Sequence, residues 1–176
     1  MVSYRILKAL NIFIFIGIVL SFLNIITLTI FYFADLSKYG LNFKMRIGVI
    51  EAYGEQLDFT LGVFVTLIIN ILLRLVLLIF ARKIISNLMK NQIFIKGNYK
   101  IIRNTSFVFV IMAISDNIPH SLVITKIIER QNLLAETINS SFSLSYGFLI
   151  VAITLFVFSL IFKEGIRIAE ENKFTV

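Results

Sequence analysis

The sequence contains no cysteine, a single histidine and a single proline among its 176 residues. Without cysteine the chain has no disulfide framework, no thiol chemistry and no cysteine-based metal site. A chain without thiols is also compatible with either an oxidising or a reducing compartment. One histidine with one nearby acid supplies too few ligands for a metal centre. The sequence also has no phosphate-binding loop, no HExxH helix and no recognisable catalytic triad. We therefore predict no enzymatic activity, no catalytic residue, no metal and no cofactor.

Charged residues are also scarce. They make up 15% of the sequence, against 59% hydrophobic residues. These proportions are far from the averages of soluble domains, and a soluble fold of this size could not bury so much apolar surface. The composition therefore predicts an integral membrane protein, with the lipid bilayer as its main partner.

Four apolar stretches each approach or exceed the ~20 residues that a helix needs to cross a bilayer. They are residues 9–33, 59–81, 105–125 and 144–162. The first stretch is too long for the apolar region of a signal peptide, so we interpret it as a retained span. Polar or helix-breaking residues interrupt the third stretch: Asp116, Asn117, Pro119 and His120. For this stretch two interpretations remain open, a kinked continuous span or a span that ends near Ser115 and continues as a re-entrant or outer segment.

Acidic residues are absent from residues 81–104, which carry six basic residues: Arg82, Lys83, Lys90, Lys96, Lys100 and Arg103. Eleven of the 17 basic residues lie in one of three regions: this segment, the residues before the first apolar stretch, and the tail 163–176. Five lie in the other two connections. Because strongly basic loops stay in the cytoplasm, this asymmetry predicts four spans with both termini inside. The predicted fold is all-α, a single four-helix bundle with a basic cytoplasmic loop 81–104, in the cytoplasmic (inner) membrane.

The two connections expected outside the membrane have their own patterns. Apolar residues alternate with other residues over 43–50, which predicts a short extended segment. Residues 126–143 have no net charge and place apolar residues at helical spacing, which predicts an amphipathic outer helix or an extension of the third span.

A cluster of polar residues is predicted inside the membrane. It comprises Asn70 and Arg74 on the second span, and Asp116, Asn117 and His120 on the third. A charged Asp116 is costly in hydrocarbon, so it pairs with Arg74, is protonated, or faces water. An ion pair would join the two spans. In a second interpretation, Arg74 only extends its guanidinium to the interface. In a third, Asp116 and His120, with Arg74, relay protons or bind a cation in a small ion-coupled transporter or channel-like protein, which would require a homo-oligomer.

The cytoplasmic loop supplies the candidate docking surface. Its members are the six basic residues of 81–104 together with Phe94 and Asn98. Such a surface suits anionic lipid headgroups or a protein partner, or its charges only fix the topology. No nucleic-acid-binding fold accompanies the charge, so direct nucleic-acid binding is not expected. The tail alternates in sign, as a solvated helix would, and its acids could pair with the basic loop.

Two stretches together resemble the DUF2975 family of small bacterial membrane proteins. The first is the tail, at Phe162, Gly165, Glu170, Glu171, Asn172, Thr175 and Val176; the second is the loop, at Lys90–Phe94, Asn98, Lys100 and Arg103. The resemblance implies a four-span layout and a role without a known reaction. Members of the family are often encoded beside a small helix-turn-helix regulator, which implies a non-enzymatic membrane partner or sensor that docks such a regulator.

Overall fold

The structure is a computed structural model and describes residues 4–34, 45–47, 50–52, 61–119, 121–122 and 144–173. Four long helices dominate these described residues, with one short pair of strands between the first two. The helices are α1 (Tyr4–Ala34), α2 (Leu61–Met89), α3 (Lys96–Ser115) and α5 (Tyr146–Lys173), and the strands are β1 (Met45–Ile47) and β2 (Ile50–Ala52).

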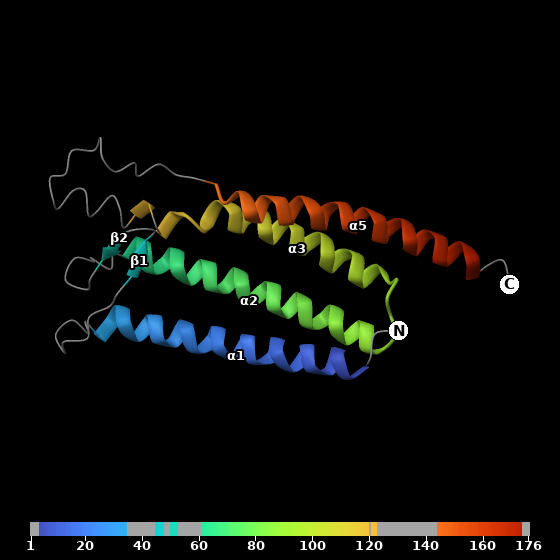
Figure 1. Cartoon of the computed structure of the whole chain (residues 1–176), viewed down its shortest axis with the longest axis horizontal. Coiled ribbons are helices and arrows are strands. Elements are labelled where there is room, and N and C mark those ends of the chain that lie inside the picture. The colour runs from blue at the N-terminus through green and yellow to red at the C-terminus, as the bar shows by residue number, and fades with distance from the viewer. Residues whose placement is uncertain are drawn as a thin grey trace.

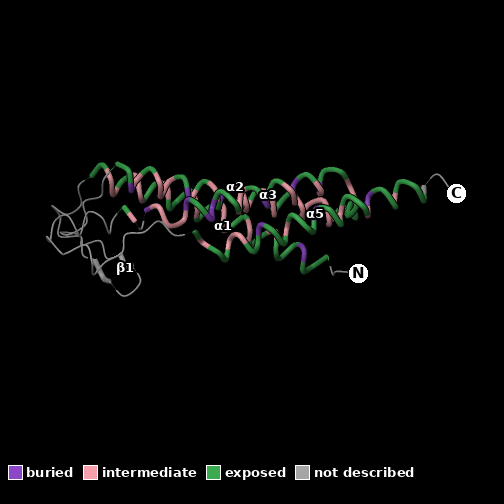
Figure 2. The backbone as a smooth tube through the Cα atoms, turned by 90° about the horizontal axis from the view of Figure 1, so that it is seen from above, coloured by how far each residue is buried: buried purple, intermediate pink, exposed green. Residues whose placement is uncertain are grey.

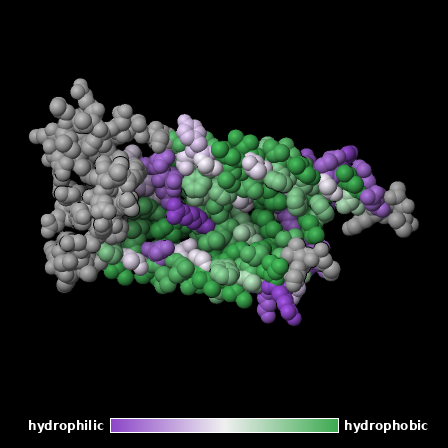
Figure 3. Space-filling view, in the orientation of Figure 1, coloured by the Kyte–Doolittle hydropathy of each residue, from purple (hydrophilic) through white to green (hydrophobic). Residues whose placement is uncertain are grey.

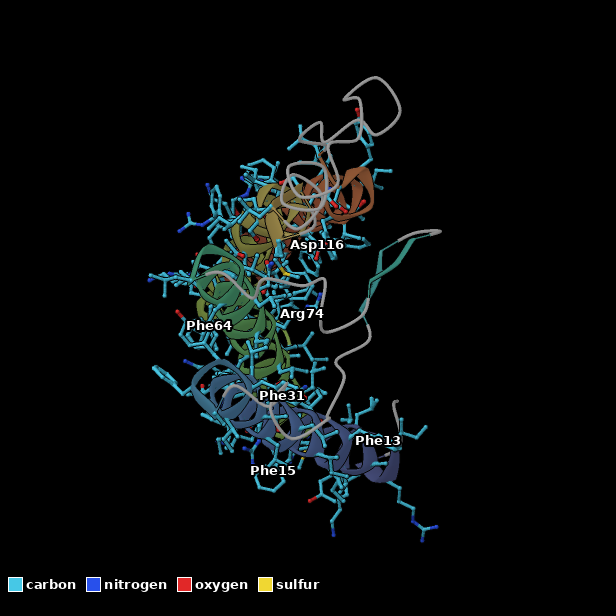
Figure 4. All side chains as sticks on the ribbon, turned by 90° about the vertical axis from the view of Figure 1, so that its left-hand side faces the viewer. Phe13, Phe15, Phe31, Phe64, Arg74 and Asp116 are labelled. Atoms are coloured by element: carbon cyan, nitrogen blue, oxygen red, sulfur yellow. The ribbon has the colours of Figure 1, made fainter. Side chains whose placement is uncertain are left out.

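The four helices lie side by side in one row, in the order α1, α2, α3, α5 (Figures 1 and 4). Each helix runs antiparallel to the next, so α1 begins, α2 ends, α3 begins and α5 ends at the same end of the row. We call this end the turn end, because it holds the turn of residues 90–95. Extensive contacts join only consecutive helices, and α1 and α5 lie at opposite edges. This single layer differs from the closed four-helix bundle expected from the sequence, which would also pack α1 against α5.

Few of the described residues are buried (Figure 2), and about half of these have small or polar side chains. Large apolar residues are exposed along every helix, and the space-filling view is hydrophobic over most of the helix row (Figure 3). Hydrophilic residues gather toward the turn end and beside the segments drawn in grey. A soluble protein with this much contiguous apolar surface would aggregate. The distribution is the one expected of helices that face lipid.

Small residues let α3 and α5 approach closely. The Ser106 hydroxyl donates to the Ala152 carbonyl (2.9 Å), and the Ser145 amide donates to the Ala113 carbonyl (3.0 Å). All but Ser145 are buried. Lipid tails are as apolar as leucine, so close packing and interhelical hydrogen bonds, rather than hydrophobicity, hold such helices together.

Among the described residues, three helices are long and apolar enough to cross a membrane: Tyr4–Ala34, Leu61–Met89 and Tyr146–Asn172. They match the first, second and fourth predicted spans. The third predicted span differs, because α3 covers Lys96–Ser115 instead of 105–125. Its first eight residues include Lys96, Lys100 and Arg103, which lower its hydropathy.

The end of α3 has a local cause. Pro119 lies four residues after Ser115, and a proline removes the amide that would bond to that carbonyl while its ring clashes with it. Regular helix stops at Ser115, with Asp116 as the C-cap residue. After a turn at Asp116 and Asn117, residues 118–119 and 121–122 are again helical, so the described residues do not decide between the two interpretations that the sequence left open.

The basic segment 81–104 is not an open loop. Helix α2 continues to Met89 and α3 begins at Lys96, so only residues 90–95 connect them. Apolar residues at helical spacing carry α2 beyond its membrane-like part: Ile84, Ile85, Leu88 and Met89. Five of the six basic residues of this segment therefore lie on helices, and Lys90 lies in the turn.

Within the predicted extended segment 43–50, the described residues 45–47 and 50 are strand. They belong to two short strands, β1 and β2, which pair antiparallel with Arg46 opposite Glu51. The predicted amphipathic helix at 126–143 lies outside the described residues, as do Thr175 and Val176 of the tail.

Candidate functional site: the turn and the polar cluster

The turn begins with a helix-ending motif. Asn91 adopts a left-handed backbone conformation, with φ of 58°. The Asn91 amide donates to the Leu88 carbonyl (3.0 Å) and the Gln92 amide donates to the Asn87 carbonyl (2.9 Å). These bonds form a Schellman motif, in which asparagine is an accepted alternative to glycine because its short polar side chain tolerates this conformation. The motif reverses the chain directly after α2.

The side chain of Asn98 then holds the turn closed. Its amide donates to the carbonyls of Gln92 (2.9 Å) and Ile93 (2.8 Å), and its oxygen accepts from Nδ2 of Asn87 (2.6 Å). Asn98 is 1% exposed. The N-cap residue of α3, Ile95, makes no side-chain capping bond, so Asn98 performs the ordering that a capping residue usually provides.

The turn packs against the part of α5 that follows its apolar stretch. The Phe94 ring lies 5.4 Å from the Phe162 ring, measured between centroids. A Cβ atom at Gly165 would stand 3.0 Å from the edge of Phe94, so glycine allows this approach. Beyond it, Lys96 Nζ lies 3.1 Å from a Glu170 carboxylate oxygen. We call this set of contacts the turn–tail clasp.

The remaining tail residues form ion pairs along α5. The Arg167 guanidinium donates to Glu164 and lies 3.5 Å from Glu171. Asn172 is exposed near the end of the helix. Exposed pairs of this kind contribute little individually, but their i,i+3 and i,i+4 spacing favours a helix beyond the apolar stretch.

Five of the six basic residues on the turn side are exposed: Arg82, Lys83, Lys90, Lys96 and Lys100. Arg82 is directed at α1, where its Nε lies 3.3 Å from the Asn11 side-chain oxygen and its guanidinium 5.0 Å from the centre of the Phe15 ring. Arg103 is half-buried and donates to the Tyr99 hydroxyl (3.3 Å). Some of the predicted docking residues therefore contact another helix, as Arg82 does, whereas others remain accessible to a partner.

The predicted polar cluster comes together in part. Asn70 Nδ2 donates to the Ser115 carbonyl (3.1 Å), and the Ser115 hydroxyl donates to Asn70 Oδ1 (2.7 Å). Both residues are buried. This reciprocal pair joins α2 to the end of α3 and satisfies every strong polar atom of the serine. Its chemistry is that of a structural interhelical contact.

Arg74 and Asp116 meet at the same junction (Figure 4). Arg74 Nη2 lies 3.5 Å from Asp116 Oδ1, and the two side chains are 60% and 29% exposed. One long contact between partly exposed charges is a weak ion pair. Of the two remaining predicted members of the cluster, Asn117 lies within the described residues and His120 lies outside them. Within the described residues, no group of three or more histidine, cysteine or acidic side chains could hold a metal ion.

Sequence reasoning missed the partners of the asparagines. Ser115 and Asn87 were not selected, although serine and asparagine in apolar helices commonly bond to a neighbouring helix. Phe162 entered only through the family resemblance. Its contact with Phe94 joins residues far apart in the sequence, and no local pattern predicts it.

Comparison with known protein families, with curated proteins and with solved structures finds no match to this chain.

Proposed function

We propose that the chain is a four-span protein of the bacterial cytoplasmic membrane, with its turn end in the cytoplasm. We further propose that it acts without catalysis, as a membrane partner or sensor that docks a small cytoplasmic helix-turn-helix regulator. The resemblance to the DUF2975 family supports both statements, because it covers the turn and the tail together.

The observation that carries the docking proposal is the surface of the turn. Ile93 and Phe94 are 45% and 53% exposed. Lys90 and Lys96, which flank them in the chain, are also exposed, as is Lys83 near the end of α2. Apolar side chains ringed by charges that can pair with a partner are typical of protein interfaces. Asn98 holds this surface in one conformation, which lowers the entropy lost on binding.

The α3 helix fits the proposed topology. The residues that follow its basic first two turns, 104–115, carry no charge and rise ~18 Å away from the turn end. Its basic residues lie within the first eight positions, at the turn end, where long side chains can reach the interface. The basic residues of the other helices lie mainly toward the same end.

Removing charge from the turn should abolish capture of the partner. In the triple variant Lys83→Gln/Lys90→Gln/Lys96→Gln we expect at least a tenfold loss of the captured regulator, since interfacial charges guide association and oppose dissociation. The measurement is affinity capture of the tagged full-length protein from cross-linked cells, followed by mass spectrometry.

The matched control removes the same charge from the two connections that we propose to lie outside the cytoplasm, as Lys38→Gln/Lys44→Gln/Lys126→Gln. It should capture the regulator as the unmodified protein does. The docking proposal fails if no helix-turn-helix protein is captured, or if both triple variants lose it equally.

A further inference from the structure

One face of α3 carries a stripe of basic residues that the docking surface does not use fully. Lys96, Lys100 and Arg103 occupy positions i, i+4 and i+7, so they lie above one another on the same side of the helix. Lys96 and Lys100 are exposed, and Arg103 is half-buried.

The same face continues as an exposed apolar surface. Phe107, Ile111 and Ile114 follow at helical spacing and are 53%, 50% and 46% exposed. From Arg103 to Ile114 the helix rises ~16 Å, which is close to the depth of one leaflet of the hydrocarbon core. The stripe therefore changes from basic to apolar over the length of one lipid molecule.

Two of the three cations lack an acidic partner. Lys96 pairs with Glu170, but within the described residues neither Lys100 nor Arg103 forms an ion pair. Tyr99 holds the Arg103 guanidinium, with its hydroxyl as acceptor and its ring centre 5.4 Å away. The buried Nε of Arg103 donates no hydrogen bond to the described residues. A guanidinium that is fixed, partly desolvated and without an acidic partner among the described residues favours a phosphate.

We propose that this face of α3 is a binding site for one anionic phospholipid. Arg103 and Lys100 bind the headgroup phosphate, with Lys96 at the rim, and one acyl chain lies along Phe107, Ile111 and Ile114. Charge complementarity favours an anionic lipid, because two cations without an acidic partner among the described residues attract a headgroup of net negative charge more strongly than a zwitterionic headgroup of zero net charge. The site shares Lys96 with the docking surface but depends on Lys100 and Arg103, and it stands whether or not the docking proposal holds.

The absence of tryptophan from the chain permits a direct test. A single Phe107→Trp substitution places the only indole on the proposed acyl-chain path. The full-length protein is reconstituted in phosphatidylcholine vesicles that contain either brominated phosphatidylglycerol or brominated phosphatidylcholine at the same mole fraction. Bromine quenches indole fluorescence at short range, so the quenching reports which lipid occupies the site.

We expect the anionic lipid to be enriched about thirtyfold over the zwitterionic lipid near Phe107→Trp, as two basic contacts would produce. The control Phe13→Trp, on a 73% exposed position of α1, should be quenched equally by both lipids. Adding Lys100→Gln/Arg103→Gln should remove the preference at position 107, whereas Lys83→Gln/Lys90→Gln should leave it.

Equal quenching of Phe107→Trp by the two lipids would overturn the proposal. The same conclusion follows if both charge-removal pairs reduce the preference to the same extent, since that result indicates general attraction to an anionic surface. The fluorescence of Phe107→Trp in the unmodified charge background provides this answer even if a charge variant fails to insert.

Discussion

Replacing Asn98 by alanine should destabilise the protein by roughly 3 kcal/mol. The substitution removes three hydrogen bonds, to Gln92, Ile93 and Asn87, from a side chain that is 1% exposed. Each bond contributes about 1 kcal/mol, and buried groups left without a partner add to the loss. The free energy of unfolding in detergent micelles, from denaturant titration followed by circular dichroism, measures the effect.

Asn104→Ala is the matched control, because Asn104 lies exposed on the same helix. It should change the free energy of unfolding by less than about 0.5 kcal/mol. Asn98→Asp would place a carboxylate oxygen against the carbonyls of Gln92 and Ile93 in a buried site, so it should destabilise the protein at least as much as Asn98→Ala. If Asn98→Ala and Asn104→Ala have the same stability, the turn does not depend on this side chain.

Replacing Gly165 by valine should open the turn–tail clasp. A Cβ atom at this position meets Phe94 at 3.0 and 3.2 Å, and a branched side chain needs still more room. Overpacking of this kind costs about 1–3 kcal/mol. At the lower end of this range, the fraction of molecules in which the turn–tail clasp is closed falls about tenfold. Phe94 would leave Phe162, and the contact between Lys96 and Glu170 would be lost with it.

Cross-linking measures the clasp cleanly because the chain has no cysteine. A protein with Lys96→Cys and Glu170→Cys should react rapidly with a short bismaleimide. Gly165→Val should slow the reaction about tenfold. Gly147→Val is the control, since a Cβ atom there would meet nothing within 4 Å. Similar rates in both valine variants would show that the tail does not depend on the close approach at Gly165.

The long apolar helices could be predicted from composition alone. Residues 9–33 have no charge, and hydropathy over that length leaves few alternatives to a membrane-crossing helix. The helix ends were harder to place. Helix α2 continues past Arg82 and Lys83 to Met89, because arginine and lysine are good helix formers and do not end a helix.

The site was predictable where residues act locally and less so where they act across helices. Sequence placed Asn70 and Asp116 at one level, and the structure brings Arg74 and Asp116 to 3.5 Å. It did not reveal that Ser115 is the partner of Asn70, or that the helices form a single row. Such packing is decided by small residues such as Ser106 and Ala113, whose role depends on which helix lies opposite.

The central claim is that the turn end of the helix row lies in the cytoplasm. Single cysteines at Lys90→Cys on the turn and Glu51→Cys on β2 test it, with a membrane-impermeant maleimide applied to spheroplasts. We predict that Glu51→Cys is labelled in intact spheroplasts, and that Lys90→Cys is labelled only after the membrane is opened. Labelling of Lys90→Cys in intact spheroplasts would place the turn outside and contradict both the topology and the docking of a cytoplasmic regulator.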